Sequence, residues 1–116
     1  MAASLAAAAY VPTQRVQALE VPERYQSVIL AVGWQPADIP TLVDVITCES
    51  SWNALAVGDG GHALGLMQIW PGTWEHAQEL DDGVPGVESW SNPAANLYTG
   101  RVLHDESGWR GWTCAR

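Results

Sequence analysis

A glutamate at the end of an apolar helical pattern is the residue whose position most suggests chemistry. Four apolar residues precede Glu49 at the i, i+3, i+4, i+7 spacing of a buried helix face: Ile39, Leu42, Val43 and Ile46. Glu49 falls at the edge of that face, in the last turn of the predicted helix. Desolvation and the negative end of the helix dipole both disfavour the charged carboxylate and so raise its pKa. A carboxyl that keeps its proton near neutral pH is what general-acid cleavage of a glycosidic bond requires.

A second carboxyl follows in a glycine-rich segment, residues 58–61, which read Gly-Asp-Gly-Gly. Asp59 could act as the general base of an inverting hydrolase, or could stabilise positive charge on the sugar. The alternative is a structural role, because Asp-Gly is a strong turn signal. We prefer the turn interpretation and keep Asp59 as a possible second catalytic carboxylate.

The elements that position these residues are mostly helices. Apolar stripes predict helices over residues 23–32 and 39–49, with Asp38 as the N-cap of the second. Thr73 is the predicted cap of a short helix, and Asn92 is the N-cap of a helix that ends near residues 107–108. Residues 54–64 predict a small hairpin or an extended loop. The expected fold is mainly α, a compact helical domain with a small β or loop insertion after the Glu49 helix.

Composition limits the classes of function. The chain has 116 residues, which fits one domain at 23–116 preceded by a tail or linker at 1–22. A net charge of −8 without a single Lys argues against nucleic acid as a partner. No apolar run is long enough for a membrane span. Seven Trp and no Phe are unusual; each single Trp is best explained as core, but the set favours some role in ligand binding.

The cysteines and histidines do not predict a metal site. Cys48 and Cys114 lie far apart and form no CxxC motif, so we expect one disulfide in an exported domain, with two buried thiols as the alternative. His62 is expected to face the catalytic cleft, and His76 and His104 to lie on helix surfaces. Three scattered histidines lack metal-ligand spacing, and we predict no metal and no cofactor.

Three segments in register resemble the soluble lytic transglycosylases. Residues 49–53 (Glu-Ser-Ser-Trp-Asn) resemble that family's Glu-Ser-x-aromatic-Asn signature. Residues 65–69 (Gly-Leu-Met-Gln-Ile) with residues 71–74 (Pro-Gly-Thr-Trp) resemble its second motif, and residues 92–100 its third. Their order and spacing agree over residues 38–108, so the chain is identified as a member of the lysozyme-like superfamily. The resemblance implies an α+β lysozyme-like fold.

This resemblance also implies an activity, a substrate and a mechanism. Peptidoglycan glycan strands would be the partner, cut between N-acetylmuramic acid and N-acetylglucosamine. Glu49 would first protonate the leaving oxygen and then accept a proton from the muramoyl C6 hydroxyl, which closes a 1,6-anhydro ring. One alternative is a hydrolytic muramidase in which Asp59 assists water. Another is a weakly active glycan-binding domain of a virion.

The residues predicted to line or support the substrate site are Ser51, His62, Gly65, Met67, Gln68, Asn96 and Tyr98. Several keep a structural alternative. The Gln68 amide could bind an N-acetyl group or cap the tight turn, and Met67 could lie beneath the sugar or in the core. Ser50 and Ser51 could hold the Glu49 carboxyl or cap the helix end. Tyr98 could present its hydroxyl to the site, although its apolar spacing favours the core.

One departure and one further resemblance complete the prediction. The family tends to place a Tyr a few residues beyond the helix glycine, near the catalytic Glu; here that position is Leu103. Residues 48–50 (Cys-Glu-Ser) and 108–114 resemble the resuscitation-promoting factors, which implies a disulfide between Cys48 and Cys114. We expect a monomer that is extracellular, at the cell wall, or virion-associated in a phage. It could also be part of a larger cell-wall or virion protein.

Overall fold

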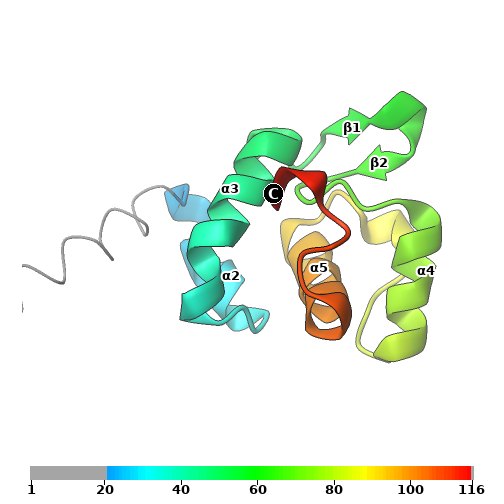
Figure 1. Ribbon diagram of the computed structural model, residues 1–116. Helices are drawn as coiled ribbons and strands as arrows, with labels where there is room; N and C mark the ends of the chain where they lie inside the picture. Colours follow the sequence, from blue (N-terminus) through cyan, green and yellow to red (C-terminus); the bar gives the residue numbers. More distant parts are fainter. Residues whose placement is uncertain (1–20, 116) are drawn as a thin grey trace, which may run out of the picture.

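The helices predicted from apolar periodicity are present in the computed structural model, which describes residues 21–115 (Figure 1). The fold is mainly α with one small two-stranded sheet, as expected. The α-helices and strands are α2 (Glu23–Ala31), α3 (Ile39–Ser50), β1 (Val57–Gly58), β2 (Ala63–Leu64), α4 (Pro71–Leu80) and α5 (Pro93–Ser107). Single 3-10 turns are η1 (Pro36–Asp38), η2 (Asp59–Gly61), η3 (Val87–Ser89) and η4 (Thr113–Ala115).

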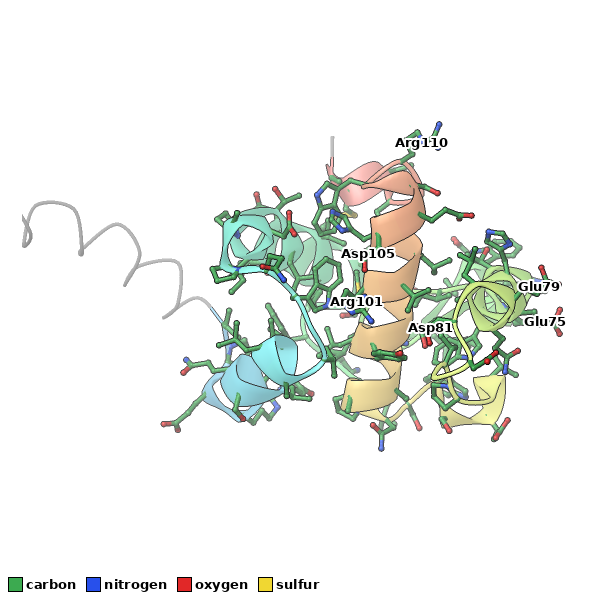
Figure 2. The ribbon with its side chains drawn as sticks, turned by 90° about the horizontal axis from the view of Figure 1, so that it is seen from below. Glu75, Glu79, Asp81, Arg101, Asp105 and Arg110 are labelled. Atoms are coloured by element: carbon green, nitrogen blue, oxygen red, sulfur yellow. A yellow bond between two sulfur atoms is a disulfide. The ribbon has the colours of Figure 1, made fainter. Side chains whose placement is uncertain are left out.

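Helix α5 is the central element of the domain. It lies between α2 and α3 on one side and α4 on the other (Figure 2). The Asn92 side chain caps its start by accepting a hydrogen bond from the Ala95 N–H at 3.1 Å, and Pro93 occupies the first turn. Leu97 and Val102 are both buried, and their positions lie about 140° apart around the helix. Because α5 is buried on two sides, it fixes the position of α4 relative to the side of the domain that contains α3 and the predicted site.

Indole rings supply both volume and polar connections in the core. Trp34, Trp74 and Trp112 are buried, and each donates its N–H to a backbone carbonyl oxygen, at 3.0, 2.8 and 2.9 Å. A buried indole N–H requires such a partner, because an unpaired donor in the core is destabilising. These three side chains therefore fulfil the core role predicted for single tryptophans.

Two helix starts differ in detail from the prediction. Helix α4 begins at Pro71 with Trp70 as the N-cap residue, so Thr73 lies inside the helix and does not cap it. The reason is that Pro is well suited to the first helical position, where its missing N–H is not needed. Asp38 does occupy the N-cap position of α3, but its side chain makes no capping hydrogen bond.

His104 was predicted on a helix surface, and that prediction is wrong. Its side chain is only 16% exposed and packs against the rings of Trp34 and Trp109, with centroid distances of 5.1 and 4.5 Å. Trp109 comes from the segment after α5, which folds back along the helix. The outward position of residue 104 is thus covered by a part of the chain that helical periodicity cannot anticipate.

The antiparallel hairpin follows α3 directly, as the glycine-rich segment indicated. Val57 pairs with Leu64 and Gly58 with Ala63, and the 3-10 turn η2 connects the two strands. Most of the predicted tail, residues 1–20, lies outside the described residues. Val21 belongs to the packed domain, since only 4% of it is exposed. None of the helices described here is long and apolar enough to cross a membrane.

The predicted disulfide between Cys48 and Cys114 is present. It joins the last turn of α3 to η4, with 5.9 Å between the two Cα atoms. In Figure 1 the end of the chain, in red, crosses to the upper end of α3, where Glu49 lies. The bond therefore fixes the C-terminal segment against the part of α3 that carries the candidate acid.

Breaking this disulfide should destabilise the domain. The bonded residues are 66 positions apart, and the chain-entropy model gives about 4 kcal/mol for a loop of that length. We expect reductant to lower the free energy of unfolding by up to that amount, measured by guanidinium denaturation. The Cys48→Ala/Cys114→Ala double variant is the control and should not respond to reductant. Equal midpoints for the native chain with and without reductant would contradict the prediction.

Candidate active site

Glu49 lies in the last turn of α3 and is partly buried. Burial raises the pKa of its carboxyl above the ordinary value, and the negative charge of Asp59 adds to the rise. Both effects favour the protonated form. The structure thus gives Glu49 the electrostatic environment of a general acid.

The two serines after Glu49 serve the backbone. The Ser50 hydroxyl lies 2.7 Å from the Leu66 carbonyl oxygen, across to the turn that follows β2. The Ser51 hydroxyl lies 3.4 Å from the Thr47 carbonyl oxygen, and Ser51 itself ends the helix in the left-handed conformation with φ 51°. A hydroxyl has one proton to donate. The serines therefore cap and connect the end of α3, which is the structural alternative of the prediction.

Asp59 is exposed at the tip of the hairpin, in the first position of η2. Its backbone has φ 48°, a left-handed conformation that Asp and Asn tolerate better than most residues. Its effect on the pKa of Glu49 nevertheless shows that the hairpin brings the two carboxyls within electrostatic range. Asp59 therefore combines a turn position with an influence on the candidate acid.

Gln68 fastens the base of the hairpin. Its side-chain N–H₂ group donates to the carbonyl oxygens of Ala56 at 3.1 Å and Gly65 at 3.0 Å. Its side-chain oxygen Oε1 lies so close to Gly58 that a Cβ atom there would be 2.4 Å away. Because both donors are used, Gln68 can offer a substrate only an acceptor. The turn-capping role is the one that these contacts support.

Met67 and Asn96 lie beneath the surface, each with no exposed area. The Asn96 side chain accepts from the Met67 N–H at 2.9 Å and donates to the carbonyl oxygens of Leu64 and Trp90 at 3.0 and 3.1 Å. Gly65 lies against this amide with φ +78°. These residues therefore support the turn of residues 64–68 through contacts inside the core, and neither Met67 nor Asn96 exposes any surface.

Tyr98 is not brought to the end of α3. Its hydroxyl donates to the Asp81 carboxylate at 3.0 Å, and Asp81 is the residue that ends α4. Gln68 precedes the other end of α4, and a helix of 10 residues spans about 15 Å. The Tyr98 hydroxyl therefore secures the end of α4, and the structure does not place it among the residues around Glu49.

A cavity of about 340 Å³ lies between α4 and the end of α5, and we call it the cleft. Its walls are Trp70, Thr73 and His76 from the α4 side; Leu103, Glu106 and Ser107 from α5; and Gly108, Arg110, Gly111 and Trp112 from the C-terminal segment, with Gln68 and Ile69 completing it. Glu49 is not among the residues that line this cavity, but both of its chain neighbours are bonded to residues next to the walls. Cys48 bonds to Cys114, two residues after Trp112, and Ser50 bonds to Leu66, two residues before Gln68.

Most of the cleft was not predicted from the sequence. Trp70, Thr73 and His76 recur every three residues, so their spacing could have indicated one face of α4. His76 contacts Glu106 across the cleft, with 2.9 Å between Nε2 and Oε1. Hydrogen bonding to Glu106 raises the pKa of His76, and the same contact lowers the pKa of Glu106. The position that the family gives to Tyr, Leu103, makes an apolar part of the wall.

The fold and this site define a mainly α, lysozyme-like domain with one candidate acid at the end of a core helix. The family model of the Transglycosylase SLT domain matches residues 31–106, and the chain belongs to this family. Membership makes peptidoglycan the substrate and glycan-strand cleavage the general activity. Neither the curated proteins nor the solved structures gave a significant match. The C-terminal wall of the cleft lies after the matched region, and the resemblance to resuscitation-promoting factors stays a prediction.

The pKa of Glu49 should respond to the charge of Asp59. Asp59→Asn keeps a residue that tolerates φ 48° but removes a negative charge. The pKa of Glu49 should fall, because the charged carboxylate is no longer opposed. Activity of a general acid declines as pH rises through its pKa, so the alkaline limb of the pH–rate profile should move to lower pH. Rates on purified peptidoglycan and NMR titration of the Glu49 carboxyl test this; a limb that stays in place or moves to higher pH would refute it.

Gly65 should be the least replaceable glycine of the site. An Ala side chain there would be strained at φ +78°, and its Cβ would lie 2.3 Å from Asn96 Nδ2 and 2.6 Å from the Trp90 carbonyl oxygen. We expect Gly65→Ala to destabilise the domain by about 2–4 kcal/mol. Gly72→Ala is the matched control: its Cβ would meet nothing within 4 Å, and Ala favours the helix, so stability should hold or rise slightly. Equal unfolding midpoints for the two variants would count against the supporting role of Gly65.

Proposed function

We propose that the chain cleaves the β-1,4 bond between N-acetylmuramic acid and N-acetylglucosamine, with Glu49 as the general acid and 1,6-anhydromuramic acid as the product. The observation that carries this proposal is the position of Glu49: a partly buried carboxyl with a raised pKa at the end of α3, whose chain neighbours are bonded to residues next to the cleft walls. Protonation of the leaving oxygen by such a group is the step that glycosidic cleavage most needs.

The proposed reaction uses one carboxyl twice. Glu49 gives its proton to the glycosidic oxygen while the bond from muramoyl C1 to that oxygen breaks. The carboxylate then takes the proton of the muramoyl C6 hydroxyl as O6 bonds to C1. Glu49 is protonated again, and no proton is gained or lost overall. Because the attacking hydroxyl belongs to the same sugar, correct positioning replaces a second catalytic carboxylate.

The surroundings of Asp59 favour this route over hydrolysis. A general base must hold a water molecule against the sugar, whereas Asp59 is exposed on a hairpin turn. The alternative, a hydrolytic muramidase, is favoured by one observation: Asp59 lies close enough to raise the pKa of Glu49. A weakly active glycan-binding virion domain explains the site less well, because binding alone does not need a carboxyl with a raised pKa.

The setting in which the chain works follows from its substrate. Peptidoglycan lies outside the cytoplasmic membrane, and disulfides persist in such oxidising surroundings. We propose that the chain acts there as a monomer, at the cell wall or as part of a larger cell-wall or virion protein.

Glu49→Gln should abolish lysis, with at least a 100-fold loss of rate, because Gln keeps the shape of the side chain but supplies no proton. Thermal unfolding should be unchanged within a few degrees.

Mass spectrometry of peptidoglycan digested by the native chain should show anhydro ends and no new reducing ends. Asp59→Asn is the control and should lower activity modestly with the same product. Lysis by Glu49→Gln within tenfold of the native rate would overturn the assignment of the acid. Reducing ends, together with a large loss in Asp59→Asn, would instead establish a muramidase.

A further inference from the structure

One aromatic side chain in this fold is placed in an unusual way. Trp70 is 47% exposed, whereas Trp34, Trp52, Trp74 and Trp112 are buried. The four other large apolar side chains that are exposed in residues 21–115 are aliphatic: Leu30, Leu55, Val57 and Leu80. Single exposed aliphatic residues are ordinary, but a half-exposed indole on the wall of a cavity points to a ligand that covers it.

Trp70 is held in place through its ring and through its backbone. The His62 ring stacks on it, with 4.9 Å between centroids and 18° between planes. His62 belongs to the hairpin, directly after η2, while Trp70 is the N-cap residue of α4 and its carbonyl accepts from the Trp74 N–H at 2.9 Å. The pair therefore forms a flat and preorganised surface that joins the hairpin to the wall of the cleft.

We propose that Trp70, backed by His62, is a sugar-stacking subsite that binds one N-acetylhexosamine ring of the glycan strand. This inference rests on the proposed function, because it identifies how the same cleft holds its substrate. The C–H face of a pyranose ring packs on an aromatic face without any need for charge, which suits a chain with a net charge of −8.

The position of Trp70 along the cleft supports a sugar over other ligands. Thr73 lies one turn further along α4 and lines the same cavity, and Gln68 is two residues before Trp70. The Thr73 hydroxyl can donate and accept, and Gln68 Oε1 can accept, which matches the hydroxyl and acetamido groups of the ring. Stacking on one face with a few polar groups at the edges is how a site holds a sugar without cations. Trp70 also lies next to the hairpin that carries Asp59, because the His62 ring stacks on its indole.

The test measures binding separately from catalysis. In the Glu49→Gln background, the dissociation constant for N-acetylglucosamine hexamer and for soluble uncross-linked glycan strands is measured by calorimetry. We expect Trp70→Ala to weaken binding by about 10-fold, Trp70→Phe to restore most of it, and His62→Ala to weaken it about threefold. Leu80→Ala is the matched control: this exposed apolar side chain of α4 is not part of the cleft, and its loss should leave binding unchanged.

In otherwise native protein, Trp70→Ala should raise KM by a similar factor while kcat changes less than about threefold. The indole N–H signal of Trp70, assigned by its loss in Trp70→Phe, should shift on titration with the hexamer. An unshifted Trp70 signal, or unchanged affinity in a folded Trp70→Ala, would overturn the subsite and leave the assignment of Glu49 intact. Loss of binding in Trp70→Ala together with full activity of Glu49→Gln would sink the catalytic assignment and keep the subsite.

Discussion

The site depends on the amide of one buried side chain. Asn96 has no exposed area, and an unpaired amide in that position would be costly. All three of its hydrogen bonds go to backbone groups: the Leu64 carbonyl in β2, the Met67 N–H in the following turn, and the Trp90 carbonyl after η3. They therefore join α5 to segments that come before and after α4. Within the turn at residues 64–68, the N–H groups of Leu64, Gly65 and Gln68 donate to backbone carbonyl oxygens, whereas the buried N–H of Met67 is bound by the Asn96 side chain.

A second side chain completes the support of the same turn. The Met67 N–H is bound by Asn96, and the Met67 carbonyl oxygen accepts the indole N–H of Trp112 at 2.9 Å. Both polar backbone groups of a buried residue are thus satisfied by side chains from α5 and from the C-terminal segment. Since that segment is also tied to α3 by the disulfide, the turn, the cleft wall and the end of α3 are held as one unit. This rigidity is what positions Ser50 and, beside it, Glu49.

The sequence predicts local features of this arrangement better than long-range ones. Apolar spacing located α2, α3 and α5, because each buries one continuous stripe, and the motif located Glu49 at the end of α3. The start of α4 was placed too late because Thr73 has the chemistry of a cap, while Pro71 already begins the helix. His104 was misplaced because the chain after α5 folds back over it.

The cleft shows the same limit. Gln68 and Ile69 belong to a motif, but one wall is made by residues 107–108 and 110–112, and a disulfide between distant cysteines ties this segment to α3. Periodicity describes one element at a time and carries no information about which distant segments meet. The structural alternatives for Gln68 and Met67 could likewise not be resolved in advance, since an amide beside a glycine turn and a Met in an apolar motif are suited to either role.

The chain is acidic and the glycan backbone is neutral. Catalysis and substrate binding therefore place different demands on the charges of the site. A negative neighbour such as Asp59 helps a general acid, because it opposes loss of the proton from Glu49. The same negative charge cannot attract a substrate that carries carboxylates on its peptides. Affinity must then come from contacts that do not depend on charge, and an exposed indole stacked on His62 is such a contact. On this view the hairpin serves both demands, because one short insertion carries Asp59 toward the acid and His62 toward Trp70.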